Sequence, residues 1–270
     1  MIVAVDTGGT KTLITSFNKS GEAGDLIRFA TPKNYTEYIE KIKFELAHNY
    51  GHKTVDVIII AIAGTVEKNL VKWSPSLKWE NKNIIEDLHG ILNSAKIVIE
   101  NDAKIAGIAA ARQLRPVPKS LFYVTIGTGI GTAMIVDGKI DKGLNQSEGG
   151  HMLIEYDGVV KQWEEFASGR AIYETFGKFA RDIKDEKTWY QIAKRISRGL
   201  LVSIPLLQPE IISIGGGIGT YLDKFIKPLN EILKSNLPNH IDLPLIVKTD
   251  NPEEAVIYGC YYYAVDLLSN

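Results

Sequence analysis

Short runs of β-branched and other apolar residues recur along the chain in the manner of buried strands. They predict strands at residues 2–5, 13–17, 55–61, 97–99, 121–126, 132–136, 211–214 and 245–248. Between many of these runs, alanine-rich segments and apolar residues at helical spacing predict helices at residues 35–50, 102–112, 166–179, 190–207, 221–233 and 252–268. Alternating strands and helices are typical of an α/β fold.

Two segments share one pattern of strand, glycine-rich turn and strand. The first covers residues 2–17 with the turn DTGGT, and the second covers residues 121–136 with the turn GTGIG. A similar hairpin at the start of each half predicts an internal duplication with one lobe per half. The two prolines within residues 115–119 predict the linker between the lobes.

Composition and charge exclude several classes of protein. The 270 residues are 45% hydrophobic and 23% charged, and the formal net charge is -1. This balance lacks the basic surface that nucleic acid or an anionic membrane requires. Cys260 is the only cysteine, so neither an intramolecular disulfide nor a cysteine metal cluster is possible. The sequence shows no signal peptide and no apolar stretch of membrane-spanning length, and we expect a cytoplasmic protein.

The first glycine turn has the sequence DTGGTKT at residues 6–12. Glycines allow backbone amides to approach a phosphate, and threonine hydroxyls and Lys11 add further donors. Asp6 could orient the water around Mg²⁺. An ordinary hairpin turn explains the two glycines equally well, and the flanking Asp6 and Lys11 favour phosphate binding.

Two further glycine-rich segments follow predicted strands. GTGIG at residues 127–131 could present amides to an anion, but a strand follows it, unlike the dinucleotide-binding fingerprint. GGGIG at residues 215–219 could let an adenine and ribose lie against bare backbone.

Two polar segments offer side chains for catalysis and sugar binding. Residues 100–103, ENDA, join a strand to a helix, where Asp102 is either a helix N-cap or a general base. Residues 148–151, EGGH, precede WEEFASG at residues 163–169. Carboxylates accept paired O–H bonds, so Glu148 and Glu164 with His151 could bind vicinal hydroxyls.

The order and spacing of these segments resemble the ROK family (repressors, open reading frames and kinases) of the sugar kinase, Hsp70 and actin superfamily. The resemblance runs from Ile2 to the final helix. It includes residues 6–12 and 127–131 as phosphate loops, residues 74–79 as a proline–tryptophan loop, residues 100–103 as the catalytic segment, residues 148–151 as the sugar motif and residues 215–217 as the adenosine motif.

The resemblance implies a two-lobed actin-like (ribonuclease H-like) α/β fold with the active site in the cleft between the lobes. The lobes are expected at residues 1–114 plus 252–270 and at residues 115–251. The implied activity is ATP- and Mg²⁺-dependent phosphorylation of a hexose at its C6 hydroxyl, as in glucokinases and hexokinases. A homodimer that binds hexose and ATP is expected.

The resemblance also assigns roles to individual residues. Asp102 is the general base. The sugar is bound by Gly64, Asn101, Asp102, Glu148, His151 and Glu164. ATP is bound by Asp6, Gly8, Gly9, Thr10, Lys11, Thr128, Gly129, Gly215, Gly216 and Gly217.

One departure from the family concerns metal. The family's zinc motif contains cysteines and falls on residues 152–164, which contain none here. We therefore expect no structural zinc, and His151 keeps only a sugar contact. We expect Trp163 to pack locally, and the looser loop to accept more than one hexose.

Several alternatives stay open. An N-acetylmannosamine or N-acetylglucosamine kinase, an enzyme of a related amino-sugar kinase family and a catalytically silent sugar sensor would share most of these motifs. We expect neither a repressor of the same family, which needs a DNA-binding extension before Ile2, nor an iron–sulfur activator ATPase, which needs several cysteines.

Overall fold

The computed structural model describes residues 1–92, 95–251 and 254–269. The chain divides into two compact units, Met1–Ala109 with Glu254–Asn270 and Ala110–Glu253. The sequence predicts these boundaries at residues 114/115 and 251/252. Pro252, the expected first-turn proline of the last helix, lies outside the described residues.

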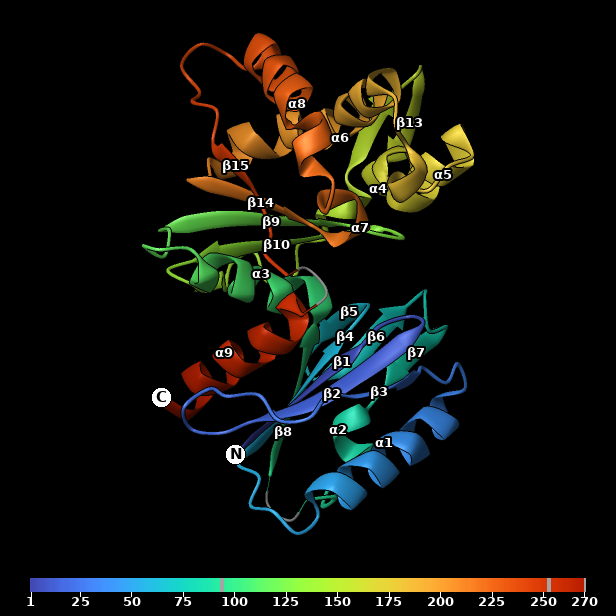
Figure 1. Ribbon diagram of the computed structural model, residues 1–270, viewed down its shortest axis with the longest axis vertical. Helices are drawn as coiled ribbons and strands as arrows, with labels where there is room; N and C mark the ends of the chain where they lie inside the picture. Colours follow the sequence, from blue (N-terminus) through green and yellow to red (C-terminus); the bar gives the residue numbers. More distant parts are fainter. Residues whose placement is uncertain (93–94, 252–253, 270) are drawn as a thin grey trace. The chain divides into compact units, whose positions relative to one another are not determined.

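The first unit is built on a five-stranded sheet in the order β3-β2-β1-β4-β8 (Figure 1). Strand β1 is antiparallel to β2 and parallel to β4, which is parallel to β8. A smaller sheet has the order β5-β6-β7. The elements are β1 Ile2–Thr7, β2 Lys11–Phe17, β3 Ile27–Ala30, α1 Tyr35–Tyr50, β4 Val57–Ile62, β5 Thr65–Glu67, β6 Leu70–Ser74, β7 Trp79–Lys82, α2 Ile84–Asp87, β8 Lys96–Asn101 and α9 Ala255–Ser269. Helix α3, Asp102–Gln113, begins in this unit and ends in the second.

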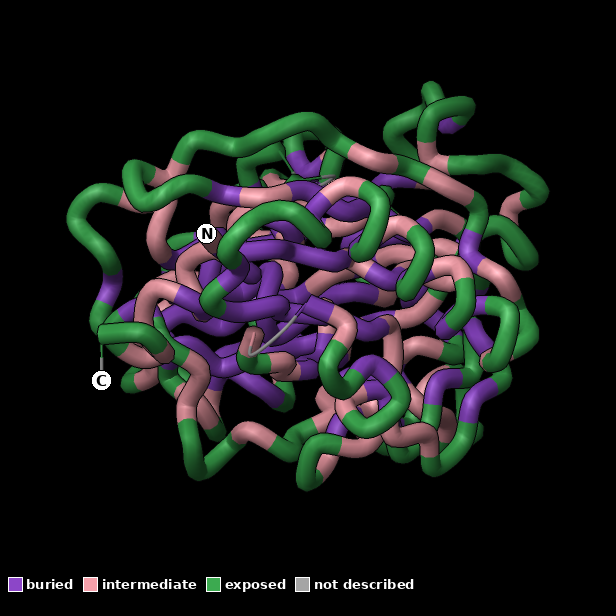
Figure 2. Tube along the Cα trace, turned by 90° about the horizontal axis from the view of Figure 1, so that it is seen from below, coloured by how far each residue is buried: buried purple, intermediate pink, exposed green. Residues whose placement is uncertain are grey.

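Helices cover both faces of this sheet. Val5 of β1 and Ile60 of β4 belong to one buried cluster with Ile42 of α1. Helix α9 contacts β1, β2 and β4, and its Tyr261 ring lies 5.0 Å from the ring of Phe17. Figure 1 shows α1 and α9 on opposite sides of the sheet, and the buried positions are purple in Figure 2. This double cover explains why β1 and β4 are almost continuously apolar.

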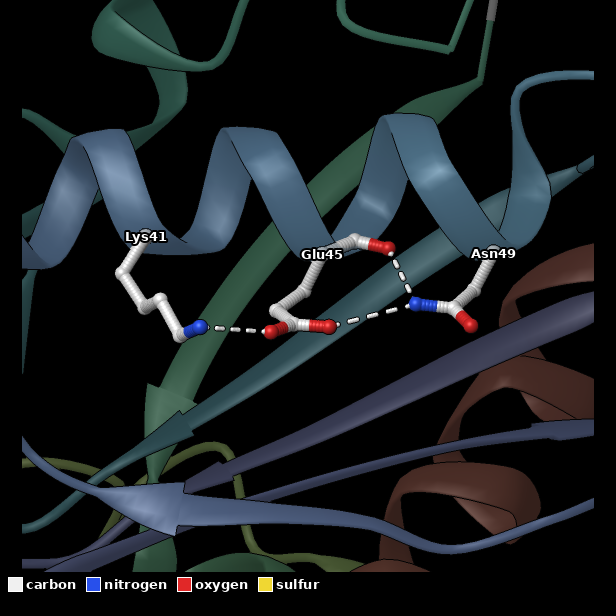
Figure 3. A network of polar contacts seen from close by, with 3 residues as sticks. All are labelled: Lys41, Glu45 and Asn49. Carbon is white, nitrogen blue, oxygen red and sulfur yellow. Dashed lines mark hydrogen bonds and ion pairs between the residues drawn. The ribbon is translucent and has the colours of Figure 1, made fainter.

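Polar contacts at i,i+4 spacing support α1 (Figure 3). Lys41 Nζ lies 2.8 Å from Oε1 of Glu45. Asn49 Nδ2 donates to the Glu45 carbonyl at 2.9 Å and to its Oε2 at 3.2 Å. At the other end, Asn34 caps the helix by accepting the Glu37 N–H. Each such pair adds about 0.2–0.5 kcal/mol to a helix that packing already stabilises.

The second unit repeats the same strand arrangement, β11-β10-β9-β14-β15. Strand β9 is antiparallel to β10 and parallel to β14, which is parallel to β15. This repeat matches the internal duplication that the two glycine turns predict. The elements are β9 Ser120–Ile126, β10 Ile130–Val136, β11 Lys139–Ile140, η1 Gly149–His151, β12 Leu153–Tyr156, β13 Val159–Gln162, α4 Trp163–Ala167, α5 Gly169–Phe176, η2 Ala180–Asp182, α6 Glu186–Leu207, β14 Ile211–Gly215, α7 Gly216–Gly219, α8 Leu222–Asn236 and β15 Leu245–Lys248.

The core of the second unit lies between its sheet and the helices α6 and α8. Val124 of β9 and Ile214 of β14 share one buried cluster with Ile196 of α6 and Phe225 of α8. Helices α6 and α8 pack against each other beside this sheet (Figure 1).

Each predicted strand overlaps an observed one, whereas some helix boundaries were wrong. The helix expected at residues 166–179 is two helices, because Ser168 caps α5 and Gly177, with φ +66°, ends it. The final helix begins at Ala255. The short strands β3, β5–β7 and β11–β13 were not predicted, since partly exposed strands lack a continuous apolar run. Within the described residues, no helix is long and apolar enough to span a membrane.

Candidate active site

The candidate residues of the first unit lie at the carboxyl ends of its parallel strands. Ile62 at the end of β4 pairs with Asn101 at the end of β8 and with the last residue of β1. Asp6 is the second-last residue of β1, Gly64 follows β4, and Asp102 begins α3 directly after β8. Ligands of open α/β sheets bind at this edge. The parallel register therefore brings three separate motifs to one place.

Asp6 and Asp102 are close enough for their charges to interact. Desolvation by burial, with a further contribution from the charge of Asp102, raises the pKa of Asp6 from 3.8 to about 7, and Lys11 opposes this shift. Two carboxyl groups whose charges interact are a favourable place for a cation. Asp6 is thus suited to hold Mg²⁺.

Asn101, rather than Asp102, caps α3. Its Oδ1 accepts the N–H of Lys104 at 3.0 Å, which is the N-cap contact, and its Nδ2 donates to the Gly64 carbonyl at 2.9 Å. Asp102 lies within the first turn and its Oδ1 accepts the Ala103 N–H at 2.8 Å. The interpretation of Asp102 as the helix N-cap was therefore wrong.

The first glycine turn is held by hydrogen bonds from its surroundings. The Gly8 N–H donates to the Lys11 carbonyl at 3.0 Å, so this amide is used within the turn. Thr31 donates its hydroxyl to the Gly8 carbonyl at 2.8 Å and its N–H to the Thr10 carbonyl at 3.1 Å. A Cβ on Gly9 would lie 2.8 Å from Cβ of Ser76, so the close packing of these loops requires glycine.

Lys33 is a residue of this site that the sequence analysis missed. Its ammonium donates to the carbonyl of Gly9 and, at 2.8 Å, to the carbonyl of Ser76. The Trp79 indole N–H donates to the Lys33 carbonyl at 3.1 Å. Lys33 thus joins the glycine turn to the loop that carries Ser76 and puts a positive charge beside it. A lysine in a polar loop carries no motif, so the sequence offered no signal.

The second glycine turn rests on Glu164 of α4. The turn closes by a hydrogen bond from the Gly127 N–H to the Gly129 carbonyl at 3.0 Å. Oε2 of Glu164 accepts the Ile130 N–H at 3.1 Å, and a Cβ on Gly129 would lie 2.5 Å from the same oxygen. Thr128, at the tip, is exposed. We expected Glu164 to contact sugar, and the structure shows that it supports this turn.

The third glycine segment adjoins the second turn. Gly215 ends β14 and pairs with Thr125 of the parallel strand β9. Gly216 has φ +76°, and a Cβ there would lie 2.6 Å from the carbonyl oxygen of Ile126. A Cβ on Gly217 would meet no atom within 4 Å. Bare backbone is therefore required at Gly216, whereas the space beside Gly217 is open.

The predicted sugar motif forms a short 3₁₀ turn. The His151 N–H donates to the Glu148 carbonyl at 3.0 Å, and the Gly149 N–H donates to the Thr132 hydroxyl at 2.9 Å. Nδ1 of His151 lies 2.6 Å from Oε1 of Gln162. Gln162 was not among the predicted residues, because no recognised motif includes it.

The segment in place of the zinc motif is a β-hairpin followed by a buried tryptophan. Strands β12 and β13 pair in antiparallel register, and Trp163 begins α4 with no exposed surface. A Cβ on Gly199 of α6 would lie 2.1 Å from the Trp163 indole, so the ring packs directly on the helix backbone. The expectation that Trp163 packs locally is confirmed. Among the described residues, no cluster of three or more His, Cys, Asp and Glu could hold a metal ion.

The sequence is similar to those of known sugar kinases. A polyphosphate glucokinase of Mycobacterium leprae (strain TN) is 29% identical over 84% of this chain and 66% of its own length. A fructokinase of Lactococcus lactis subsp. cremoris is 25% identical over 98% of this chain and 97% of its own.

The fold is also found among solved structures. A ROK family glucokinase from Streptomyces griseus, in complex with glucose and AMPPNP, superposes with a TM-score of 0.81 at 20% identity, covering 97% of this chain and 98% of that one. This likeness confirms the expected actin-like α/β fold. The ROK family model matches residues 2–266, and the chain therefore belongs to the ROK family.

Proposed function

We propose that this protein is a sugar kinase that transfers the γ-phosphoryl group of ATP to the C6 hydroxyl of a hexose. The observation that supports this most directly is that the charge of Asp6 interacts with the charges of both Asp102 and Lys11, at the carboxyl edge of three parallel strands. Membership of the ROK family and the similarity to a fructokinase and a polyphosphate glucokinase support the sugar as acceptor.

Asp102 is assigned the role of general base. Its carboxylate would accept the proton of the C6 hydroxyl as the oxygen attacks the γ-phosphate, a contribution of roughly 10²–10⁴ in rate. Asn101 already holds the start of α3 and the Gly64 carbonyl, so the base sits on a rigid junction. The side-chain amide of Asn101 and the backbone of Gly64 would bind the sugar next to Asp102.

We assign the remaining sugar contacts to residues of the second unit. Glu148 and Glu164 would accept hydroxyl hydrogens, and His151 would contact a further sugar group. Oε2 of Glu164 already accepts the Ile130 N–H, so we assign the other carboxylate oxygen to the sugar. A carboxylate shared in this way would couple sugar binding to the position of the second phosphate turn.

Each unit contributes donors to the nucleotide. In the first unit the donors would be Gly9, Thr10 and Lys11, and Lys33 adds charge beside them. Gly8, whose N–H is used within the turn, would line the phosphate site with its bare backbone. In the second unit, Thr128 and Gly129 would contact phosphate.

The bare backbone of Gly215, Gly216 and Gly217 would lie along the adenosine. Asp6 would hold Mg²⁺, which when bound neutralises charge on the phosphates. Phosphoryl transfer depends mainly on such positioning and charge stabilisation.

A coupled ADP-release assay over a panel of sugars tests the proposal. We expect ATP turnover that depends on a hexose, with 6-deoxyglucose inactive as acceptor but inhibitory. Phosphorus NMR of the product should show a phosphate ester at C6. ADP release that no sugar stimulates would reject the proposal, and a phosphate at another carbon would reject the assigned position.

The same panel decides between related activities. Glucose, mannose, fructose, N-acetylmannosamine and N-acetylglucosamine are compared as acceptors, and polyphosphate is compared with ATP as donor. Preferred turnover of an N-acetylhexosamine would identify an amino-sugar kinase, whereas sugar binding without turnover would identify a sensor. Light scattering tests the expected homodimer.

A further inference from the structure

The ring of His151 is held by a short hydrogen bond to a neighbouring side chain. Nδ1 of His151 lies 2.6 Å from Oε1 of Gln162. An amide oxygen can only accept, so the imidazole donates from Nδ1. In the neutral ring, Nε2 then carries no hydrogen and can only accept.

The backbone holds both partners of this hydrogen bond. His151 closes the turn η1 with its N–H on the Glu148 carbonyl at 3.0 Å. Gln162 pairs with Leu153 across the hairpin β12–β13, and its N–H donates to Oε2 of Glu165 at 2.6 Å. Because both residues lie at the base of one hairpin, their side chains meet without a long flexible reach.

The turn that carries His151 is also fixed against the sheet. A Cβ on Gly150 would lie 2.0 Å from the carbonyl oxygen of Ile130, so the turn packs directly on β10. The Gly149 N–H donates to the Thr132 hydroxyl of the same strand at 2.9 Å. Movement of the histidine backbone is therefore restricted, and the ring orientation depends on Gln162.

We infer that Gln162 is a positioning residue that fixes His151 as a hydrogen-bond acceptor toward the sugar. The group that His151 contacts must then be a donor, either a hydroxyl or the N–H of an acetamido substituent. A metal ion on Nδ1 would require that nitrogen unprotonated and would leave the hydrogen on Nε2, giving the opposite polarity. The inference rests on the proposed function only for the identity of the ligand.

Nitrogen NMR of the protein labelled with ¹⁵N-histidine tests the tautomer without any substrate. The chain has five histidines, and the His151 signals are assigned by their loss in His151→Phe. At a pH where the ring is neutral, we expect a protonated Nδ1 and an unprotonated Nε2.

Two variants of Gln162 test whether its side chain sets this tautomer. Gln162→Leu removes the acceptor and should move His151 toward the Nε2–H tautomer, which histidine prefers in water. Gln162→Glu keeps an acceptor oxygen and should retain Nδ1–H. An Nε2–H tautomer in the parent would overturn the inference.

Kinetics with paired sugar analogues test the polarity. Fluorine cannot donate a hydrogen bond, so at the position that His151 contacts, the deoxy and deoxyfluoro sugars should lose kcat/KM by similar factors, about tenfold or more. Gln162→Leu should raise the sugar KM about tenfold while kcat stays within twofold, and Gln162→Glu should restore the KM.

A control substitution in the same hairpin separates the positioning role of Gln162 from a general disturbance of the hairpin. Val160 lies on the same strand as Gln162 and is 63% exposed, so Val160→Thr should leave the sugar KM and the tautomer unchanged. Equal effects of Val160→Thr and Gln162→Leu would overturn the positioning role, as would a deoxyfluoro sugar that performs as well as its parent at every position. If no sugar is phosphorylated, the proposed function fails, and the NMR result still decides what Gln162 does.

Discussion

Glu164 and Gly129 are in direct contact, although one lies on helix α4 and the other in the turn between β9 and β10. Oε2 of Glu164 accepts the N–H of Ile130 at 3.1 Å, and a Cβ on Gly129 would lie 2.5 Å from that oxygen. A residue assigned to the sugar thus supports a turn assigned to phosphate. Changing the turn should therefore alter sugar binding.

Gly129→Ala should raise the sugar KM about tenfold or more, because the new methyl group displaces the Glu164 carboxylate. Stability should fall little, since the end of a flexible side chain can move. Gly127→Ala is the matched control, because a Cβ there meets no atom within 4 Å. It should leave the sugar KM unchanged, whatever its effect on the KM for ATP. Equal sugar KM values in the two variants would contradict the coupling.

Asp102→Asn should lower sugar-dependent kcat by about 10²–10⁴ while leaving sugar binding largely intact. The amide keeps the size and hydrogen-bonding capacity of the side chain, but it cannot accept a proton at neutral pH. Sugar affinity is measured separately by the rise in Tm with sugar concentration. Turnover within a few-fold of the parent would remove Asp102 from the role of base.

The raised pKa of Asp6 predicts how stability depends on pH. Its pKa is about 7 in the folded protein against an ordinary value of 3.8, so the folded state binds this proton more tightly than the unfolded state. The resulting stabilisation is fully present below about pH 4 and is lost as the pH rises through about 7. Asp6→Asn should therefore flatten the decline in the free energy of unfolding between these values.

Urea denaturation at several pH values, without Mg²⁺ or nucleotide, measures this difference. The exposed Asp223 on α8 offers a control, since Asp223→Asn should leave the parent's decline unchanged. Parallel curves for Asp6→Asn and the parent would show that Asp6 does not titrate in this range. Loss of Asp102 charge in Asp102→Asn should weaken the effect, because that charge contributes to the raised pKa.

The sequence predicted the buried strands better than the other elements. Strands β1, β4 and β9 are covered on both faces or lie deep in a core, so their residues form continuous apolar runs. Strands β12 and β13 expose Leu153, Val159 and Val160, and such short, half-exposed strands resemble loops in sequence. The boundary between α4 and α5 depends on the Ser168 cap, which interrupts an otherwise helical pattern.

Some residues of the candidate site were likewise predictable from the sequence, and others were not. Asp6 and Asp102 were named from motifs at predicted strand ends, where parallel strands place functional groups together. Lys33 and Gln162 act through single long side chains that reach neighbouring loops. Such contacts depend on three-dimensional packing, and no spacing along the chain reveals them.

The protein should contain no structural zinc. Elemental analysis of protein purified without a histidine tag should find far less than one zinc per chain, and EDTA should leave Tm unchanged. The physical reason is that the segment at residues 152–164 has no cysteine and is held instead by the hairpin, the His151–Gln162 contact and Trp163. Stoichiometric zinc, or a Tm that falls on chelation, would contradict this.

Gly199→Ala should destabilise the protein, although alanine is the better helix former. Inside a helix, alanine is normally favoured over glycine by about 1 kcal/mol. Here the new Cβ would lie 2.1 Å from the Trp163 indole, and overpacking of a core typically costs about 1–3 kcal/mol. We expect the free energy of unfolding in urea to fall.

A second substitution at Trp163 tests the cause of this loss. Because the Trp163 Nε1 has no hydrogen-bond partner among the described residues, adding Trp163→Phe should create space without losing a hydrogen bond and should recover part of the loss. Gly217→Ala, where no atom lies within 4 Å, serves as the control and should leave stability nearly unchanged. A stabilised Gly199→Ala variant would show that the indole can move away from α6, and that Trp163 does not brace the hairpin.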